Sequence, residues 1–385
     1  MRKLIWLFLL VLAVTSSLYA APRRRGVRHP GAEAVKTQYR VDAHRSGTSL
    51  ETGPRWLDTE LWNRPLPGPV RGLVFDRNVV YAGGFGGVYA VNPANGADLW
   101  VFSQPNVQFS PVAIVDDEVY VSGGNTFYVL DRATGALLWS INTLAAIDKT
   151  SPLIVDDVAF VGDVNGVVYA INLVGRSYVW SRNIGSPVRT HLASSKEVLV
   201  VVTDGALRGV NMGSGIERWS KAGNWSAPAA DDKHVYAGLD GGAFYKLDVN
   251  SGHTEWTFTD PNSGSQKWST PALKDDTVVV AGIVTNGNQW FYKIDVTTGM
   301  WRLFIEQVST PLISDPIIGS DSRIYFGKGN DPQAPFAPNE MYVFNMQFGF
   351  EASRYLYGHV LGAPAIGNGV VFVHDTTNTL SAFTN

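Results

Sequence analysis

Short runs of alternating apolar and polar residues, separated by turns rich in Gly, Asn and Asp, follow one another from Trp56 to the end of the chain. A period of two is the pattern of β-strands with one buried face. No window longer than ten residues carries the apolar stripe of an amphipathic helix. The pattern therefore predicts an all-β protein of many short strands.

One ten-residue pattern recurs among these strands: a strand end, a polar turn, and a new strand that carries a tryptophan. Its copies lie at 91–100, 130–139, 171–180, 210–219 and 247–256, and they end on Trp100, Trp139, Trp180, Trp219 and Trp256. The intervals between these tryptophans are 39, 41, 39 and 37 residues. A period near 40 with several strands per unit is typical of propellers and solenoids.

The period divides the chain into seven units of four strand-like runs, at 67–106, 107–146, 147–186, 187–224, 225–266, 267–310 and 311–358. The remainder, 359–385, has three such runs and lacks the fourth. A spare run at 59–64 carries Trp62, which lies 38 residues before Trp100 and so in phase with the series. We therefore predict an eight-bladed β-propeller of four-stranded blades over 53–385. The N-terminal strand completes the last blade, closes the ring and leaves no long open edge.

The repeated tryptophans, Trp62 included, are predicted to lie on outer strands and to pack between neighbouring blades. The glycine four or five residues before each one would let the backbone pass close to the ring. Residues that recur at the same position of every repeat are more typical of a structural contact between repeats than of a single binding site, so we assign the tryptophans a structural role.

Residues 1–20 have the layout of a secretory signal, with Arg2 and Lys3, an apolar run at 4–14 and a cleavage region that ends on Ala20. The apolar run is short for a bilayer span, so we expect cleavage, no transmembrane span, and a location in the periplasm or outside the cell. The alternative is an uncleaved anchor, and the basic run 23–25 counts against export. Residues 21–52 are predicted to be a flexible tail and a lead-in segment.

Composition narrows the function. The formal net charge of −3 gives no electrostatic basis for binding nucleic acid. The chain has no cysteine, which excludes disulfides, zinc–thiolate sites, iron–sulfur clusters and covalent haem. For the same reason we expect no lipid anchor on an N-terminal cysteine.

The segments 130–139 and 247–256 resemble the pyrroloquinoline-quinone-like propeller repeat, and 39–47 is similar to the segment before the first blade in many secreted members. One branch of that family contains dehydrogenases that bind the quinone and calcium over the propeller axis. The other is non-catalytic and includes the propeller component of the outer-membrane barrel assembly machinery. In size the chain resembles the second branch. The resemblance implies an exported, non-enzymatic scaffold that binds a protein partner in the envelope and uses no cofactor.

The first strand of a blade lines the central channel, and most units place a proline in it. Three residues before that position, consecutive units carry Gln108, Lys149, Arg189, Trp225 and Trp268. We predict that these five residues lie at one mouth of the channel. Two cations beside two aromatic rings could hold a planar anion or a peptide carboxylate. The structural alternative is a variable rim that only covers the channel.

Acidic pairs recur at 116–117, 156–157, 231–232 and 275–276, always between the first and second strands of a unit. They belong to different blades, whereas a calcium site needs six to eight converging oxygens, so we interpret them as turn residues and expect no metal site. The seven histidines show no ligand spacing, and we expect no catalytic set.

Two alternatives stay open. One is a small oxidoreductase that uses pyrroloquinoline quinone with calcium at the Lys149, Arg189, Trp225 and Trp268 mouth. The other is a carbohydrate-binding propeller in which exposed Trp225 and Trp268 stack on sugars. The proline-rich insertion at 331–338 is predicted to be a projecting loop.

Overall fold

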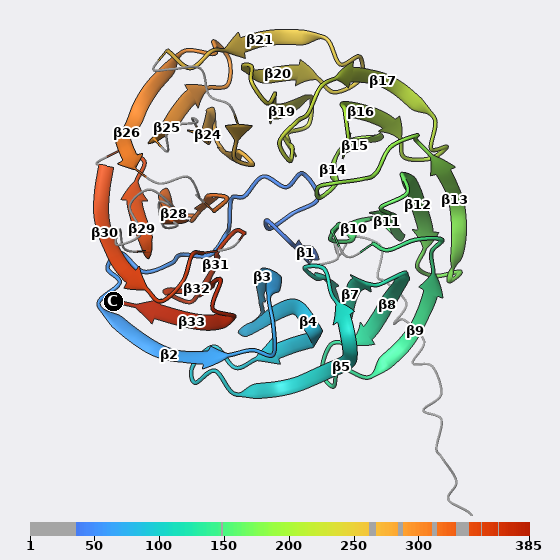
Figure 1. The fold of residues 1–385 in the computed structure, drawn as a ribbon, viewed down its shortest axis with the longest axis horizontal. Coiled ribbons are helices and arrows are strands. Elements are labelled where there is room, and N and C mark those ends of the chain that lie inside the picture. Colours follow the sequence, from blue (N-terminus) through green and yellow to red (C-terminus); the bar gives the residue numbers. More distant parts are fainter. Residues whose placement is uncertain are drawn as a thin grey trace, which may run out of the picture. The chain divides into compact units, whose positions relative to one another are not determined.

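The computed structural model describes residues 36–147, 149–261, 267–283, 288–309, 314–328, 339–347, 349–360 and 362–385. All of the elements in these residues are β-strands, and the strands form eight sheets arranged in a ring (Figure 1). The predicted eight-bladed propeller is confirmed. No helix in the described ranges has the length and hydropathy needed to cross a bilayer. The predicted signal sequence at 1–20, most of the predicted tail and the insertion at 331–338 lie outside the described residues.

Each blade is an antiparallel meander that begins at the axis and ends at the perimeter. Blades 1 to 4 contain β3 (Val70–Asp76), β4 (Val79–Val91) and β5 (Asp98–Gln108); β6 (Ala113–Val115), β7 (Glu118–Gly123), β8 (Thr126–Asp131) and β9 (Leu137–Asn142); β10 (Leu153–Val155), β11 (Val158–Gly162), β12 (Val167–Asn172) and β13 (Ser177–Asn183); β14 (Ala193–Ser195), β15 (Val198–Thr203), β16 (Ala206–Asn211) and β17 (Glu217–Ala222).

Blades 5 to 8 follow in the same way. They contain β18 (Ala229–Ala230), β19 (His234–Gly238), β20 (Phe244–Asp248) and β21 (Thr254–Phe258); β22 (Lys267–Trp268), β23 (Ala272–Lys274), β24 (Thr277–Ile283), β25 (Asn288–Asp295) and β26 (Trp301–Ser309); β27 (Ile317–Ile318), β28 (Arg323–Lys328), β29 (Asn339–Asn345) and β30 (Gly349–Leu356); β31 (Ala365–Gly367), β32 (Val370–His374), β33 (Thr379–Thr384) and β2 (Thr59–Pro65).

Blade 8 closes the ring with strands from both ends of the chain. Its order is β2-β33-β32-β31, and Trp62 of β2 lies opposite Ala382 of β33. The N-terminal strand therefore completes the last blade, as the phase of Trp62 predicted.

Blade 1 joins its two middle strands into the single strand β4. The first half of β4 pairs with β3 and the second half with β5, and the chain turns at Gly86, where φ is +81°. Gly83 also has no space for a side chain, because a Cβ there would lie 1.8 Å from the Ser110 carbonyl oxygen.

The tryptophans of the repeat join each blade to the next. The indole N–H donates to a backbone carbonyl in the following blade at 2.7–2.9 Å in five joints: Trp62 to Pro93, Trp100 to Arg132, Trp180 to Met212, Trp219 to Val249 and Trp256 to Val296. A glycine with φ of +68° to +70° in the same turn lies against each ring: Gly96, Gly135, Gly215, Gly252 and Gly299. We expected the glycine that precedes each tryptophan in sequence to make room for its ring. That expectation is wrong, because the glycine in contact with each ring belongs to the next blade.

The joint at Trp139 departs from this arrangement. The position that holds glycine in the other five turns is Arg176, with φ of +52°. Its guanidinium carbon lies 5.9 Å from the centre of the Trp139 ring, a distance at which a cation is attracted to an aromatic face.

Each of these outer strands also contains a β-bulge directly before its tryptophan. The register skips one residue there, and the skipped residues are Leu61, Leu99, Leu138, Val179, Arg218 and Glu255. All six are exposed at the perimeter. A bulge redirects one side chain without breaking the sheet, so the ring carries one such outward position in each of these blades.

Candidate functional site

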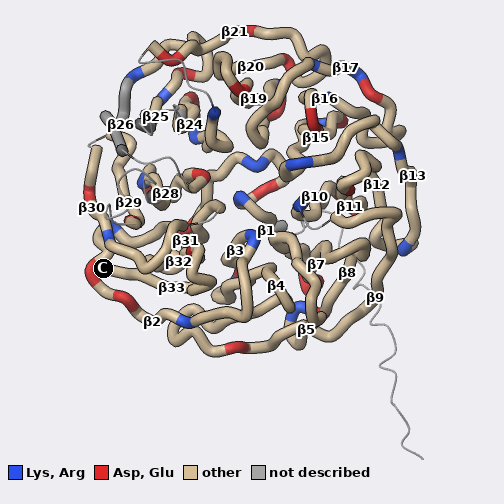
Figure 2. Tube along the Cα trace, viewed as in Figure 1, with Lys and Arg blue, Asp and Glu red and all other residues tan. Residues whose placement is uncertain are grey.

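The lead-in segment runs inside the ring and crosses its centre (Figure 1). We call residues 36–54 the axial segment. It begins with β1 (Lys36–Gln38), which pairs antiparallel with β6, the innermost strand of blade 2. Figure 2 shows basic positions, in blue, on this segment near the centre of the ring.

After β1 the axial segment passes the innermost strands of blades 4 to 8 in turn. Its carbonyl oxygens accept backbone N–H bonds of 2.7–3.0 Å, from Ser194 to Ala43, Ala230 to His44, Leu273 to Ser46, Ile318 to Gly47 and Gly369 to Thr52. The inner edge of a blade would otherwise present unpaired backbone groups, so the segment satisfies edges that the blades cannot satisfy among themselves.

Side chains of the axial segment reach the remaining two blades. The Gln38 amide exchanges two hydrogen bonds of 2.9 Å with the backbone of Ile154 in blade 3, as an additional strand residue would. The Thr37 hydroxyl donates to the Asp76 carboxylate of blade 1 at 2.6 Å. Residues 36–54 therefore contact all eight blades.

Two buried arginines hold the middle of the axial segment against the blades through hydrogen bonds to backbone carbonyls. Arg45 is 1% exposed and donates to the carbonyl oxygens of Leu192, Tyr39, Pro152 and Ser151 at 2.9, 2.6, 3.1 and 3.3 Å. Burial lowers the pKa of Arg45 to about 9. Arg40 donates to the carbonyls of Pro271 and Pro316. The first-strand prolines that aligned the units thus supply three of these acceptors.

The backbone of the segment is strained where these arginines lie. Arg40, Val41 and Arg45 have φ of +56°, +82° and +57°, a region that residues with side chains rarely adopt. Such a conformation persists only where surrounding contacts hold it, and the carbonyl bonds of the two arginines are such contacts.

Tyr39 and His191 pack at the axis above these arginines, with ring centres 4.4 Å apart. Burial raises the pKa of Tyr39 to about 12. Burial and the nearby charges of Arg45, Arg40 and Arg71 lower the pKa of His191 to about 3. The neutral imidazole Nδ1 accepts a hydrogen bond of 3.0 Å from the Ser151 N–H.

Of the five residues predicted at the channel mouth, Arg189 pairs with a further residue, Asp204, and the charge of Lys149 acts on the same carboxylate. Both cations are exposed, and Arg189 holds the Asp204 carboxylate with two bonds of 2.6 Å. The hydrogen bond from Arg189 lowers the pKa of Asp204, and the charge of Lys149 acts in the same direction. Asp204 lies in the turn between β15 and β16, and its Asp-Gly dipeptide marks only a turn in the sequence.

Gln108 lies at the end of β5 and is half-buried. Its amide N–H donates to the carbonyls of Pro69 and Phe109 at 3.3 and 3.2 Å. It therefore ties the last residues of blade 1 to the start of that blade.

Trp225 and Trp268 are buried between blades, with 7% and 5% exposed. The Trp225 ring meets Tyr245 edge-on at 5.1 Å, and Trp268 packs 5.5 Å from Phe244. Their N–H groups donate to the carbonyls of Lys221 and Gly242, each at 3.2 Å. The expectation that these two rings are exposed to a sugar is wrong, because the core covers their faces.

The five residues do not fit a planar quinone with its calcium ion. Both indole rings are covered, and Arg189 is already paired with Asp204. Across the described ranges, no three acidic or histidine side chains converge on a point that could hold a metal ion. Asp116, Asp156 and Asp275 of the acidic pairs have φ of +52°, +50° and +50°, the conformation of turn residues.

Comparisons with known proteins give the following similarities. The family described as outer membrane protein assembly factor BamB matches residues 84–223 and, in an overlapping second match, 164–303. Together the two matches extend over more than half of the chain. An outer membrane protein assembly factor BamB of Moranella endobia (strain PCIT) is 21% identical over 300 residues, which are 72% of this chain and 75% of that protein.

Two solved structures are similar in fold. BamB from Moraxella catarrhalis has a TM-score of 0.64 and 15% identity, with 85% of this chain and 99% of that chain covered. Quinohemoprotein alcohol dehydrogenase from Comamonas testosteroni has a TM-score of 0.70 and 12% identity, with 90% and 80% covered. An assembly factor and an alcohol dehydrogenase thus share this architecture, so the fold does not select between their functions.

Proposed function

The chain belongs to the family described as outer membrane protein assembly factor BamB, and from this premise we propose that it is an exported scaffold for the assembly of outer membrane proteins. It acts by binding a protein partner in the cell envelope and catalyses no reaction. It works without a bound quinone or metal.

The axial segment is the observation that carries this proposal. Residues 36–54 contact every blade and lie along the axis, where propellers have a central channel. Because the chain itself occupies the axis, the faces and the perimeter of the ring are the surfaces left for a partner. The buried Arg40 and Arg45 bind the axial segment to backbone carbonyls of the blades, so their guanidinium groups are not available to a ligand.

The partner site that we propose on the face of the ring is the exposed group of Lys149, Arg189 and Asp204. Arg189 pairs with Asp204, and the charge of Lys149 is left over, so the group retains a positive charge that suits an acidic segment of a partner. Exposed charges of this kind act more on the rate and specificity of association than on affinity. We therefore expect binding at this site to weaken as salt increases.

Affinity capture from the native envelope tests the proposal. Wild-type protein with a C-terminal tag should retain components of the outer membrane assembly machinery, and Lys149→Glu with Arg189→Glu should release them. The matched control is Lys196→Glu with Lys233→Glu, because these exposed lysines lie in turns at the opposite ends of the strands. Retention that is equal in all three proteins would place the partner elsewhere.

A second measurement addresses catalysis. Pyrroloquinoline quinone and calcium are added to purified protein, and excess cofactor is removed. We expect no cofactor absorbance to remain with the protein and no dye reduction with alcohols or sugars. Stoichiometric retention with dye reduction would contradict the scaffold proposal.

A further inference from the structure

The perimeter of the ring changes character from one side to the other. Four consecutive blades, 8, 1, 2 and 3, place aliphatic residues at the bulged position: Leu61, Leu99, Leu138 and Val179, which are 39%, 52%, 39% and 49% exposed. The next two blades place Arg218 and Glu255 there. The outer strands β2, β5, β9 and β13 follow one another around the rim in Figure 1. Exposed apolar positions that adjoin one another are typical of interaction surfaces.

Strand β5 stands out within this apolar part of the rim. It has 11 residues, whereas the other outer strands have 5 to 9. Its register with β4 is interrupted between Ser103 and Gln108, where Pro105 lies, so the regular part of the edge is Asp98–Ser103. Among the described strands it pairs only with β4, so its outer edge has no strand beside it. Leu99 and Val101, 52% and 39% exposed, project from the same stretch. An unpaired edge with exposed apolar side chains is a template for adding a strand.

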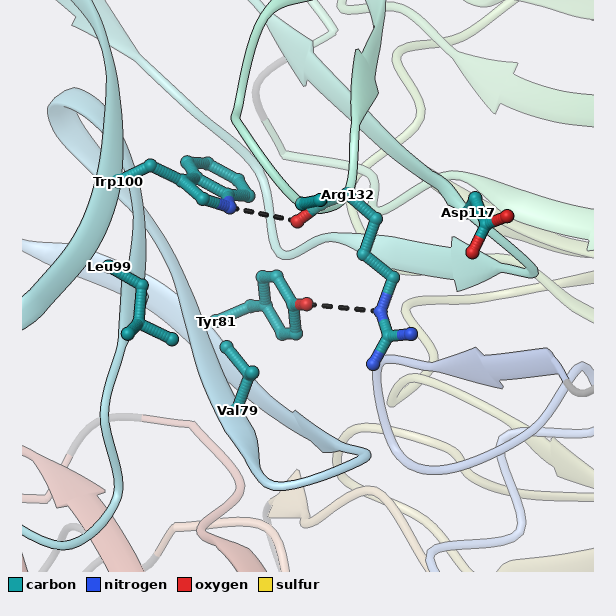
Figure 3. Close-up of a pocket in the computed structure, with 7 residues that line it drawn as sticks. Val79, Tyr81, Leu99, Trp100, Asp117 and Arg132 are labelled. Carbon is teal, nitrogen blue, oxygen red and sulfur yellow. Dashed lines mark hydrogen bonds between the residues drawn. The ribbon is translucent and has the colours of Figure 1, made fainter.

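A cavity of about 180 Å³ opens beside the start of β5, between blades 1 and 2. Figure 3 shows its lining, in which Leu99 and Trp100 come from β5, Tyr81 from β4, and Arg132 from the turn after β8. Asp117, from the turn between β6 and β7, and Ala133 complete the lining and are exposed. The walls are mainly apolar, and charged groups lie at one end.

The cavity exists because this joint departs from the repeat. The second residue of the turn before the outer strand is apolar in the other six blades that have it, as Pro93, Leu173, Met212, Val249, Val296 and Met346. In blade 2 that residue is Arg132. Its guanidinium lies 3.0 Å from the buried carboxylate of Asp76 and donates to the Tyr81 hydroxyl at 3.2 Å. The head group points to Asp76, and the space beside Trp100 stays open.

We propose that the outer edge of β5 binds an extended segment of a protein partner, which places an apolar side chain in this cavity and a lysine or arginine beside Asp117. The proposal rests on the proposed function, since it describes a second contact of the same scaffold. It is independent of the Lys149 and Arg189 group.

The volume and the apolar lining of the cavity suit one apolar side chain of a partner. A void of about 150 Å³ lined by apolar side chains accommodates a benzene ring, so about 180 Å³ receives one leucine or phenylalanine side chain. The Tyr81 and Trp100 rings, whose centres lie 5.9 Å apart, offer aromatic surface for that contact. A strand paired with β5 would point alternate side chains toward this joint.

The charges around the cavity select the neighbouring residue. Arg132 is matched by Asp76 on its buried side, and Asp98 is paired with Arg64 at 2.6 Å. Asp117 is exposed in the turn between β6 and β7. Asp116 precedes it, and Arg77 donates to the Asp116 carbonyl at 3.4 Å. Two carboxylates thus stand against one cation, so the net charge that faces an incoming segment is negative. A cation in that segment meets a complementary charge, and an acidic residue is repelled.

Selection from a random peptide display library tests this inference. Wild-type protein should enrich sequences with a large apolar residue close to a lysine or arginine. Ala133→Phe places a ring in the cavity from an exposed position and should weaken binding of the selected peptides at least tenfold. Thr297→Phe makes the same change at the corresponding exposed position of blade 6 and should leave their binding unchanged.

Several outcomes would overturn the inference. They are no enrichment, enrichment of acidic peptides, and equal binding by the Ala133→Phe and Thr297→Phe proteins. Concentration-dependent dimerisation that Ala133→Phe abolishes would instead assign the surface to a second copy of the chain. In cells, a gene deletion that lowers outer membrane protein levels while Ala133→Phe does not would refute this contact and leave the proposed function standing. If the deletion has no effect, the proposed function fails, and the peptide measurement still decides the contact.

Discussion

At the perimeter of the propeller one side-chain contact is repeated from blade to blade, whereas the side chains of the axial segment each make a different contact. Trp219 donates to the carbonyl of Val249 and lies against Gly252, and four other joints reproduce this arrangement. At the axis, Gln38, Arg40 and Arg45 each meet a different set of carbonyls. A perimeter joint connects two blades, but the axial segment connects eight. Damage at the axis should therefore affect the whole ring, and damage at one joint should be local.

Removing Arg45 is the strongest way to examine this difference. Arg45→Leu deletes all four guanidinium hydrogen bonds and leaves carbonyls of blades 3 and 4 buried without partners. Because an unsatisfied buried group costs about 1–3 kcal/mol, we expect a loss on the order of 5 kcal/mol, measured by urea unfolding. The control is Arg218→Leu at the perimeter, whose ion pair with the exposed Glu197 should contribute less than about 1 kcal/mol. Equal losses of unfolding free energy in the two variants would mean that the axial segment stabilises the ring no more than a single perimeter contact does.

Truncating one tryptophan examines a single perimeter joint. Trp219→Ala empties a buried site and removes the bond to Val249, so we expect a loss of about 3–5 kcal/mol in thermal or urea unfolding. Trp139→Ala should cost less, because that ring is only partly buried and its joint has Arg176 in place of glycine. A larger loss at Trp139 would contradict the interpretation of Trp219 as the better-packed joint.

The axis should also respond to acid. His374 faces it near Tyr39, since a Cβ on Gly362 would lie 3.5 Å from the His374 Nε2 and 3.1 Å from the Tyr39 hydroxyl. Burial lowers the pKa of His374 to about 3, whereas in the unfolded chain the imidazole has its ordinary value of about 6.5. The unfolded state therefore binds the proton first, and stability is lost as the pH falls from about 6.5 toward 3.

At pH 5 this difference amounts to about 2 kcal/mol. His374→Leu should remove about half of the dependence of the unfolding free energy on pH over that range, because His191 has its pKa lowered to about 3 in the same way. His253→Leu, at an exposed perimeter turn, should leave the dependence as it is. A pH profile that His374→Leu does not alter would show that another group controls acid stability.

The smallest expected effect concerns the glycine of a perimeter turn. Gly252 has φ of +68° and lies against Trp219, so Gly252→Ala combines a left-handed backbone with a crowded Cβ and should cost about 1–2 kcal/mol. The corresponding residue of blade 3 is already Arg176, and Arg176→Ala should cost less than about 1 kcal/mol, through its contact with Trp139. Differences in melting temperature would measure both. If the two costs are equal, the glycine is not required by the Trp219 contact.

Repetition decided how much of the fold could be predicted. A contact that recurs in each blade leaves a period in the sequence, so the tryptophan spacing gave the number of blades and the phase of Trp62 gave ring closure. The glycine partner was misassigned because a period shows that residues recur, and it does not show which copies touch. Alignment of the units singled out Lys149 and Arg189 as a predicted site, which stays a prediction. Asp204, the partner of Arg189, was missed, because its Asp-Gly turn has the same composition as a purely structural hairpin.

The sequence by itself determined the all-β class, the eight four-stranded blades and the strand that closes the ring, because alternation and period are local and repeated properties. Only the tertiary structure decided the path of residues 36–54 through the axis, the burial of Trp225 and Trp268, and the cavity beside β5. Each of these depends on contacts made once, between residues far apart in the chain. Arg132 pairs with Asp76 across 56 positions and between two blades. Because this ion pair occurs once, it produces no repeated pattern from which the sequence could have predicted it.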